Sequence, residues 1–321
     1  MQSLILTGDN VITADLADAF DRAEEFVAAS TAKNTRLAYD NAWRDFSEWS
    51  RAHGLDALPA SPATVGLYLA DVADRLKVST LKLRLSAIAV RHREAGHPLD
   101  RSHPAIRKVM RGVARMKGSA PNKKEAATGE ILRDAIRAYA AGGSLKAKRD
   151  RALLAVGFFA ALRRSELVAI NVADLTFTAD GVILRLPRRK TDAEGAGTDI
   201  GLPIKRDGMI CPVKALREWL VAAEIVDGPI FRSISKGDKV LSPRLSDRDV
   251  ARIVKAATNA AGYDASLFSG HSLRSGFVTT AARAGVSDHV IMKQTGHKRL
   301  EELHGYIRRA GLFTENAAAM I

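Results

Sequence analysis

The sequence has little cysteine and no long hydrophobic run, and each absence excludes a class of protein. Cys211 is the single cysteine among 321 residues, which excludes a disulfide framework and a zinc site built from cysteines. The longest apolar run, residues 152–162, is too short to span a bilayer and predicts a buried helix. The N-terminus lacks a basic stretch followed by an apolar one, so we expect no secretory signal. A reducing, cytoplasmic location fits these features.

Acidic charge is scarce in one segment, and this asymmetry indicates a polyanionic partner. The net charge is +13 and the pI is near 10, which suggests nucleic acid or an acidic membrane surface. Residues 1–60 contain 5 Lys or Arg and 10 Asp or Glu, whereas residues 75–124 contain 14 and 2. Such a local excess is typical of a surface that faces phosphates. A solvated helix face is the alternative interpretation.

The first part of the chain has helical patterns and no strand pattern. Five helices are predicted, at 13–30, from about Asn34, from the Ser61 cap, from a Thr80 cap to Gly96, and at 103–118. In the second of these, aromatic residues at helical spacing predict a core-facing stripe: Tyr39, Trp43, Phe46 and Trp49. The first domain is therefore expected to be helical and to cover residues 1–117.

A linker rich in Gly, Pro, Ser and Lys follows at residues 118–128, and a second domain at 129–321. Helices are expected at 129–141 and 144–160. The runs "LTFT" and "VILRLP" flank Asp180-Gly181, which predicts a hairpin, and "TDIGLPI" predicts a third strand. Helices are expected again from about residue 212 to the end. The predicted fold class is mainly α with a small antiparallel β-sheet in the second domain.

Four short motifs of the second domain contain residues suited to chemistry. "ALRRSEL" contains Arg163 and Glu166, and "LPRRK" ends at Lys190. "SGHSLRSG" contains His271 and Arg274, which share a face if the segment is helical. "TGHKRLEELHGY" places Tyr306 nine residues after His297. Each motif is weak alone, since a lone histidine is usually structural, but their order along the chain is specific.

This order resembles the tyrosine recombinase (phage integrase) family, in particular its two-domain Cre and Xer-type members. The resemblance covers nearly the whole chain and implies a helical core-binding domain and an α+β catalytic domain, which form a C-shaped clamp around DNA. It implies roles for six residues: Arg163 and Arg274 clamp the phosphate, Lys190 is the hairpin lysine, His271 and His297 are the two histidines, and Tyr306 is the nucleophile. Arg188 and Arg189 remain alternatives to Lys190.

The chemistry of phosphodiester cleavage suits these residue types. Arginines stay charged and donate paired hydrogen bonds to the oxygens where negative charge develops. A tyrosine, with an ordinary pKa of about 10, is both a usable nucleophile and a good leaving group. The covalent phosphotyrosine conserves the energy of the broken bond, so rejoining needs no ATP, and the scheme needs no metal or other cofactor. Lys190 is expected to protonate the departing 5′-oxygen, and His271 to accept the proton of Tyr306.

Several residues near these motifs are predicted to have structural or orienting roles and no direct part in the reaction. Glu166 is expected to orient a basic partner, and Asp174 to cap or turn the chain into the first strand. His304 is expected to be structural or to face DNA. A metal site is the rival explanation for the histidines, but no HExxH motif or carboxylate at ligand spacing accompanies them: His271, His289, His297 and His304.

The resemblance also implies the partners. These are double-stranded DNA with specific recombination sites, a homodimer on each site, and a homotetramer in the synapse that exchanges strands through a Holliday junction, in a prokaryotic cytoplasm. The last ten residues are expected to pack onto a neighbouring protomer or onto their own domain, and Arg308 and Arg309 to contact DNA or a protomer. The candidate DNA-binding residues lie in the basic segment: Arg84, Arg91, Arg107, Lys108, Arg111 and Arg115.

Two alternative functions would share either the chemistry or the fold predicted here. A type IB-like topoisomerase or a telomere resolvase would share the chemistry but not the outcome, and the small helical first domain argues against both. A DNA-binding architectural protein would share the fold without the activity, and the complete set of six residues argues against it.

Overall fold

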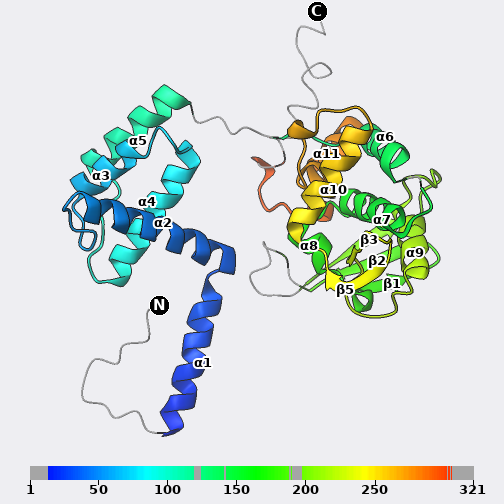
Figure 1. The fold of residues 1–321 in the computed structure, drawn as a ribbon, viewed down its shortest axis with the longest axis horizontal. Coiled ribbons are helices and arrows are strands. Elements are labelled where there is room, and N and C mark those ends of the chain that lie inside the picture. Colours follow the sequence, from blue (N-terminus) through cyan, green and yellow to red (C-terminus); the bar gives the residue numbers. More distant parts are fainter. Residues whose placement is uncertain are drawn as a thin grey trace, which may run out of the picture. The chain divides into compact units, whose positions relative to one another are not determined.

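The computed structural model describes residues 14–118, 124–140, 142–187, 189, 197–301, 303 and 305. It divides the chain into two compact units, residues 1–122 and 123–321 (Figure 1). The expected linker, residues 118–128, spans this division. The chain is mainly helical with small antiparallel sheets, which confirms the predicted fold class. Within the described residues, no helix is both long and apolar enough to cross a membrane.

The first unit consists of helices, as the sequence predicts. They are α1 (Ala14–Ser30), α2 (Lys33–Ala52), α3 (Pro62–Asp71), α4 (Val78–Glu94) and α5 (Pro104–Lys117). Ser61 caps α3, because its hydroxyl accepts a 3.0 Å hydrogen bond from the backbone N–H of Thr64. The predicted cap at Thr80 is wrong. The N–H of Thr80 already donates to the carbonyl of Lys77, so the helix begins one turn earlier.

The aromatic stripe of α2 faces the core of the first unit. Phe46 is fully buried and stacks edge-on against Tyr68 of α3, while Trp43 and Trp49 pack at the margin of the same core. The indole N–H of Trp49 donates to Asp71 at 2.9 Å, so its polar atom is satisfied as its ring is buried. Trp43, Phe46 and Trp49 are therefore structural, as the sequence predicts, whereas Tyr39 is not part of this core.

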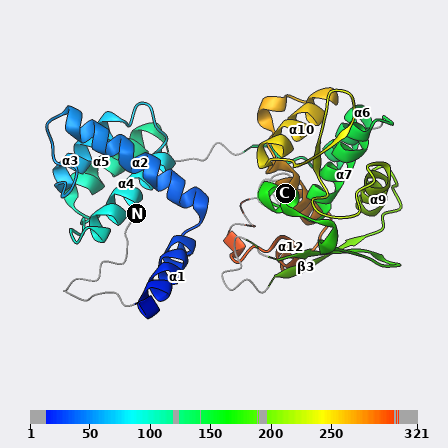
Figure 2. The same cartoon turned by 60° about the horizontal axis from the view of Figure 1, so that its bottom comes forward.

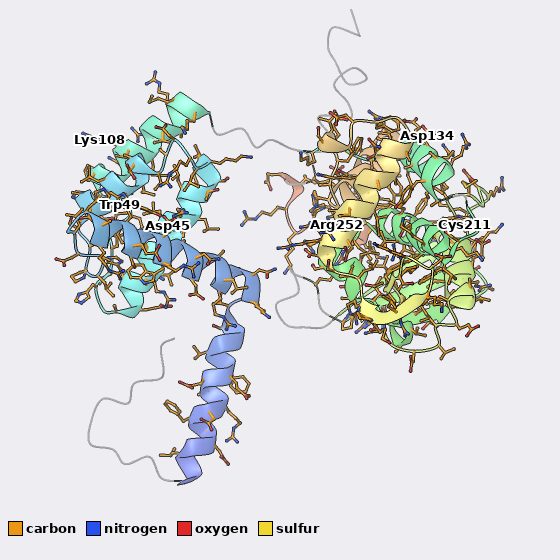
Figure 3. All side chains as sticks on the ribbon, viewed as in Figure 1. Asp45, Trp49, Lys108, Asp134, Cys211 and Arg252 are labelled. Atoms are coloured by element: carbon orange, nitrogen blue, oxygen red, sulfur yellow. The ribbon has the colours of Figure 1, made fainter. Side chains whose placement is uncertain are left out.

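The second unit is built around α7 (Leu145–Phe159), which lies among other helices in both views (Figures 1 and 2). Residues 152–158 of α7 are all buried, because the second half of this helix is apolar on every side and needs partners all round. The other helices are α6 (Gly129–Tyr139), α8 (Arg164–Ala169), α9 (Pro212–Ala222), α10 (Asp247–Ala260), α11 (Ser272–Arg283) and α12 (Asp288–Thr295), with 3-10 turns η1 (Val172–Asp174) and η2 (Ala265–Leu267). The buried Cys211 precedes α9 (Figure 3).

A three-stranded antiparallel sheet packs beside these helices, in the order β1 (Leu175–Phe177), β2 (Gly181–Leu186) and β3 (Thr198–Pro203). The central pairing places Leu184 opposite Leu175 and Ile200. Alternate residues of β2 are buried, so one face of the sheet lies on the core. Asp174 turns the chain into β1 and accepts a 2.8 Å hydrogen bond from the N–H of Asn171.

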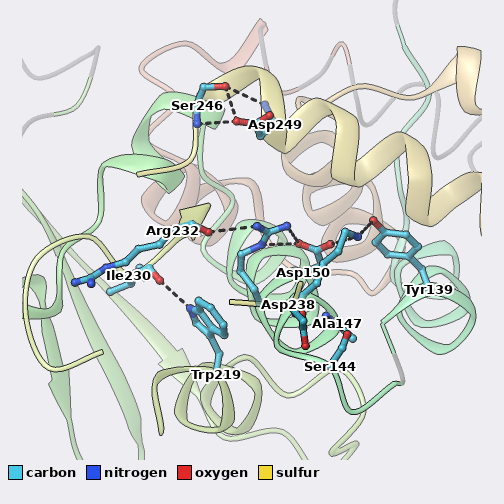
Figure 4. A network of polar contacts seen from close by, with 12 residues as sticks. Tyr139, Ser144, Ala147, Asp150, Trp219, Ile230, Arg232, Asp238, Ser246 and Asp249 are labelled. Atoms are coloured by element: carbon cyan, nitrogen blue, oxygen red, sulfur yellow. Dashed lines mark hydrogen bonds and ion pairs between the residues drawn. The ribbon is translucent and has the colours of Figure 1, made fainter. Parts of the chain in front are cut away.

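A second hairpin, β4 (Arg232–Ile234) and β5 (Val240–Arg244), contradicts the expectation of helices alone after residue 212. These strands are short and half-exposed, so their sequence shows no apolar alternation. The carbonyl of Arg232 in β4 accepts a 3.2 Å hydrogen bond from Arg149 of α7. Arg149 also donates at 2.6 and 2.8 Å to the fully buried Asp150, within the polar network in Figure 4. The hydrogen bond from Arg149 thus links β4 to the buried α7.

Candidate active site

Arg163 lies where the chain leaves the buried helix α7 and enters α8. The turn between them includes Ala161 in a left-handed conformation, with φ +50°, and Arg163 occupies the N-cap position of α8. Glu166, in the first turn of α8, accepts hydrogen bonds from the Arg163 backbone N–H at 2.8 Å and from its Nη1 at 2.6 Å. One buried carboxylate therefore caps the helix and also orients the guanidinium.

Arg274 is hydrogen-bonded to the same turn. It lies in α11, its side chain is buried, and its Nη1 donates to the carbonyl of Ala161 at 2.7 Å. Its Nη2 lies 3.1 Å from Nε2 of His297, just beyond α12. The structure therefore connects the turn before Arg163, helix α11 and the "TGH" segment, three parts of the chain that lie far apart in the sequence.

The hydrogen bonds of His297 determine which of its nitrogens bears the proton. Arg274 can only donate, so Nε2 of His297 accepts. A neutral imidazole then has its proton on Nδ1, which lies 2.8 Å from Oγ1 of Thr295. The Thr295 hydroxyl donates in turn to the carbonyl of Ile291, also at 2.8 Å, so its oxygen is available to accept. Thr295, which the sequence reasoning did not identify, thereby fixes the tautomer of His297.

Both histidines are uncharged near neutral pH. Burial lowers the pKa of His297 to about 4, and nearby Arg274, Arg163, His271 and Arg189 add to the shift. His271 occupies the N-cap position of α11, where its side chain reaches solvent. The pKa of His271 is also lowered, by the surrounding protein atoms and then by the cationic charge of Arg274. A neutral imidazole can accept a proton, so His271 is suited to act as a base.

The hairpin motif lies only partly within the described residues. Lys190 and Arg188 lie outside them, whereas Arg189 is described and buried, with its Nη2 donating to the carbonyl of Thr295 at 2.8 Å. Its Nε lies 3.9 Å from Oε1 of Glu166. Since an arginine does not give up its proton in proteins, Arg189 is a poor alternative to Lys190 as a proton donor, and Lys190 stays the prediction.

Tyr306 lies outside the described residues, as do His304, Arg308, Arg309 and the last ten residues. Shortly before Tyr306, Leu303 is fully buried against Val278 of α11 and Ile291 of α12. The chain that leads to Tyr306 is therefore anchored on the two helices next to Arg274 and His297. The described residues contain no group of three or more His, Cys, Asp or Glu side chains that could hold a metal ion.

The basic residues of the first unit fall into two groups. Four are exposed along α5: Arg107, Lys108, Arg111 and Arg115. Figure 3 shows Lys108 at the outside of this unit. By contrast, Arg84 is largely buried and binds Asp45 and Tyr68, and Arg91 donates to Asp40 at 2.6 Å. These two arginines tie α4 to α2, so the structure gives them a role in packing that the charge count did not reveal.

Comparisons with known proteins point to one family. A family model described as "Phage integrase family" matches residues 131–311. An "Integrase/recombinase xerD homolog" of Selenomonas ruminantium is 41% identical over 303 residues, which cover 92% of this chain and 87% of that protein. "Recombinase cre" of Escherichia phage P1 is 27% identical over 284 residues, with coverages of 83% and 81%.

The chain belongs to the phage integrase family. It is a tyrosine recombinase of the Cre and Xer type, and hence an enzyme of DNA recombination. A solved structure of a lambda integrase tetramer bound to a Holliday junction has the same fold, with a TM-score of 0.55 and 19% identity. The likeness covers 96% of this recombinase and 81% of that chain.

Proposed function

We propose that this recombinase cuts and rejoins DNA at specific sites through a covalent 3′-phosphotyrosyl intermediate. The observation that best supports this is the convergence of Arg163, His271, Arg274 and His297, from separate motifs, around one turn of the chain. Such a cluster of guanidiniums and neutral imidazoles is suited to one anionic group, a phosphodiester. Tyr306 is assigned as the nucleophile from its motif.

The two arginines bind the phosphate and stabilise its transition state. Attack on phosphorus places negative charge on the non-bridging oxygens, and fixed guanidinium donors lower the energy of that charge. Both side chains are held by protein contacts, Arg163 by Glu166 and Arg274 by the carbonyl of Ala161. Little reorganisation is then needed during the reaction.

The proton transfers balance without a metal, ATP or another cofactor. The hydroxyl oxygen of Tyr306 forms the new bond to phosphorus as the bond to the 5′-oxygen breaks. The proton of Tyr306 passes to neutral His271, and Lys190 supplies a proton to the departing 5′-oxygen. Attack by a 5′-hydroxyl of another strand reverses the sequence and releases Tyr306. Because one phosphodiester replaces another, the recombined DNA is sealed.

To donate a hydrogen bond to the scissile phosphate, Nε2 of His297 has to gain a proton. Its Nε2 accepts a hydrogen bond from Arg274, so it has no proton to offer to a phosphate oxygen. An anionic phosphate nearby favours uptake of a proton and raises the pKa of the ring. We therefore assign His297 as a donor to the scissile phosphate once DNA is bound.

The rest of the proposed function concerns DNA and assembly. The basic face of α5 would contact the DNA backbone, and the helical unit of residues 1–117 and the catalytic unit of 129–321 would close as a C-shaped clamp around the duplex. A homodimer would occupy each site and a homotetramer the synapse, with exchange through a Holliday junction. The similar lambda integrase supports this proposal, since its structure is a tetramer on such a junction.

A nicked suicide substrate tests the proposal. The flanking DNA of the gene supplies candidate sites, and the nick releases the 5′ end so that the covalent complex accumulates. Wild-type protein should become joined to the 3′-phosphate, and Tyr306→Phe should form no adduct while still binding the DNA. An adduct with Tyr306→Phe would refute the assignment. Relaxation of supercoiled DNA that lacks such sites would instead support a topoisomerase.

A further inference from the structure

Arg189 is a buried cation that the proposed chemistry does not use. Its side chain is 3% exposed, and its Nη2 donates to the carbonyl of Thr295, the last residue of α12. Among the described residues, its Nε has no hydrogen-bond partner. Burial lowers the pKa of Arg189, and the nearby Glu166 opposes this shift. Burying a charge costs free energy, so the contacts of Arg189 have to compensate for that cost.

The compensating contacts lie in the segments that Arg189 joins. On one side is Glu166, 3.9 Å from its Nε, and the same carboxylate oxygen accepts from Arg163 at 2.6 Å. On the other side is the C-terminal end of α12, where the partial negative charge of the helix favours a cation. Thr295 at that end has its hydroxyl on Nδ1 of His297. Arg189 therefore lies between the segment of Arg163 and that of His297.

Gly296 shows how closely the guanidinium is fitted. This residue ends α12 in the left-handed conformation, with φ +70°. A Cβ added to it would lie 2.7 Å from Nη1 of Arg189 and 2.9 Å from Cζ. The space beside Gly296 is thus filled by the planar head of Arg189, and a side chain there would push the two segments apart.

We propose that Arg189 is a positioning residue for strand cleavage, which sets the placement of Arg163 relative to His297 by bridging Glu166 and the Thr295 carbonyl. In this proposal Arg189 acts through Glu166 and Thr295 and takes no part in bond making or proton transfer. It also adds a positive charge that keeps His297 neutral until DNA binds, together with Arg274, Arg163 and His271. This inference rests on the proposed function, because it concerns the same site.

The test uses the full chain, with Arg189→Gln, Arg189→Lys and a matched control. Arg151 of α7 provides the control, because it also donates to a carbonyl, that of Met209 at 3.0 Å, and to a glutamate, Glu218 at 2.9 Å. Two quantities are measured for each protein. One is the pKa of His297 by NMR in histidine-labelled protein without DNA, and the other is the single-turnover cleavage rate of the nicked substrate at saturating DNA.

Arg189→Gln should raise the pKa of His297 and slow cleavage by about 10–100-fold, with DNA affinity retained. Arg189→Lys keeps the charge but cannot bridge Glu166 and the Thr295 carbonyl with one planar group. It should therefore leave the pKa of His297 low, and it should also reduce the rate of cleavage. Arg151→Gln should change neither quantity. Should Arg189→Gln not fold, the lysine variant alone decides. The proposal would be overturned if Arg189→Lys cleaved at the wild-type rate, or if the pKa of His297 were unchanged in Arg189→Gln. It would also be overturned if Arg151→Gln slowed cleavage as much as the Arg189 variants do.

The two possible failures are distinguishable. If wild-type protein forms no adduct with any candidate site, the proposed function fails, whereas the NMR titration still reports whether Arg189 controls His297. If wild-type protein cleaves and the Arg189 variants behave as it does, the inference about Arg189 fails alone.

Discussion

Nη2 of Arg274 lies 3.1 Å from Nε2 of His297, so two residues 23 positions apart are hydrogen-bonded. The contact assigns the protons of the imidazole, because a guanidinium can only donate. An incoming phosphate oxygen would compete for the same arginine nitrogen and free Nε2 of His297 to take up a proton.

Acid should destabilise the fold through His297. Its folded pKa of about 4 lies below its ordinary value of 6.5, so between these pH values the unfolded chain binds more protons. The stability from this group is complete above pH 6.5 and is lost as the pH falls toward 4. Urea unfolding at both pH values, in wild type and His297→Gln, measures it. The variant should lose less on acidification, because it lacks this imidazole, whereas the buried His92 is present in both proteins. An equal loss would contradict the low pKa.

Arg274→Lys should nearly abolish cleavage while DNA still binds. Lysine keeps the charge but cannot donate to the carbonyl of Ala161, His297 and the phosphate from one planar group. The loss of such a fixed donor costs at least about 100-fold in rate. Single-turnover cleavage of the nicked substrate, with mobility-shift titration as the binding control, measures both effects. A variant that cleaves within severalfold of wild type would show that the fork geometry is unimportant.

Gly276→Ala should destabilise the catalytic unit by about 1–3 kcal/mol or more. A Cβ at this position in α11 would lie 1.8 Å from the carbonyl oxygen of Ala127, in the segment that enters the unit. That segment is also held by the N–H of Ala127, which donates to the carbonyl of Ser272 at 2.9 Å. Thermal unfolding measures the loss.

The matched control for Gly276 is Gly112, a helical glycine of α5 with nothing near its added Cβ. Gly112→Ala should be neutral or stabilise by about 1 kcal/mol, because alanine favours a helix over glycine. Equal effects of the two substitutions would show that the close approach of residue 127 to α11 does not constrain the fold.

Neutralising the basic face of α5 should weaken DNA binding and flatten its salt dependence. If Arg107, Lys108 or Arg111 neutralises a phosphate, its replacement by glutamine should reduce the slope of log K against log salt by about 0.9. Lys214→Gln on α9, an exposed residue that pairs with Glu218, is the control. Binding titrations from low to moderate salt provide the slopes. Unchanged slopes for all three α5 variants would place the DNA backbone elsewhere.

Arg84→Gln separates charge from packing in the same basic segment. Its guanidinium binds Asp45 and Tyr68, and burial with the Asp45 hydrogen bond raises the pKa of Tyr68. The substitution should lower the free energy of unfolding of the first unit, because Asp45 loses its main cationic partner. The loss should be at most about 3–5 kcal/mol, because Asp45 is partly exposed to solvent in the native structure. Denaturant unfolding measures the loss. A change in the salt slope at unchanged stability would restore Arg84 to the DNA-binding set.

The sequence by itself determined most of the helices and the first sheet, and its motifs predicted the reacting groups. Buried helices and alternating strands have local periodicities, so α7 and β2 were predictable from their own residues. The order of Arg163, His271-x-x-Arg274, His297 and Tyr306 was sufficient to indicate the family. The hairpin β4–β5 was missed because its strands are short and show no apolar alternation.

Only the tertiary structure decided how these groups act on one another. Arg84, Arg91 and Arg107 count alike in the composition, but ion pairs with Asp45 and Asp40 assign the first two to packing, whereas Arg107 is exposed. Likewise, nothing local distinguishes Arg189 from its neighbours or gives Thr295 a role. The protonation of His297 and the bridging position of Arg189 arise from contacts between residues up to 106 positions apart. Hydrogen bonds and charge act through space, and sequence patterns report only what is adjacent along the chain.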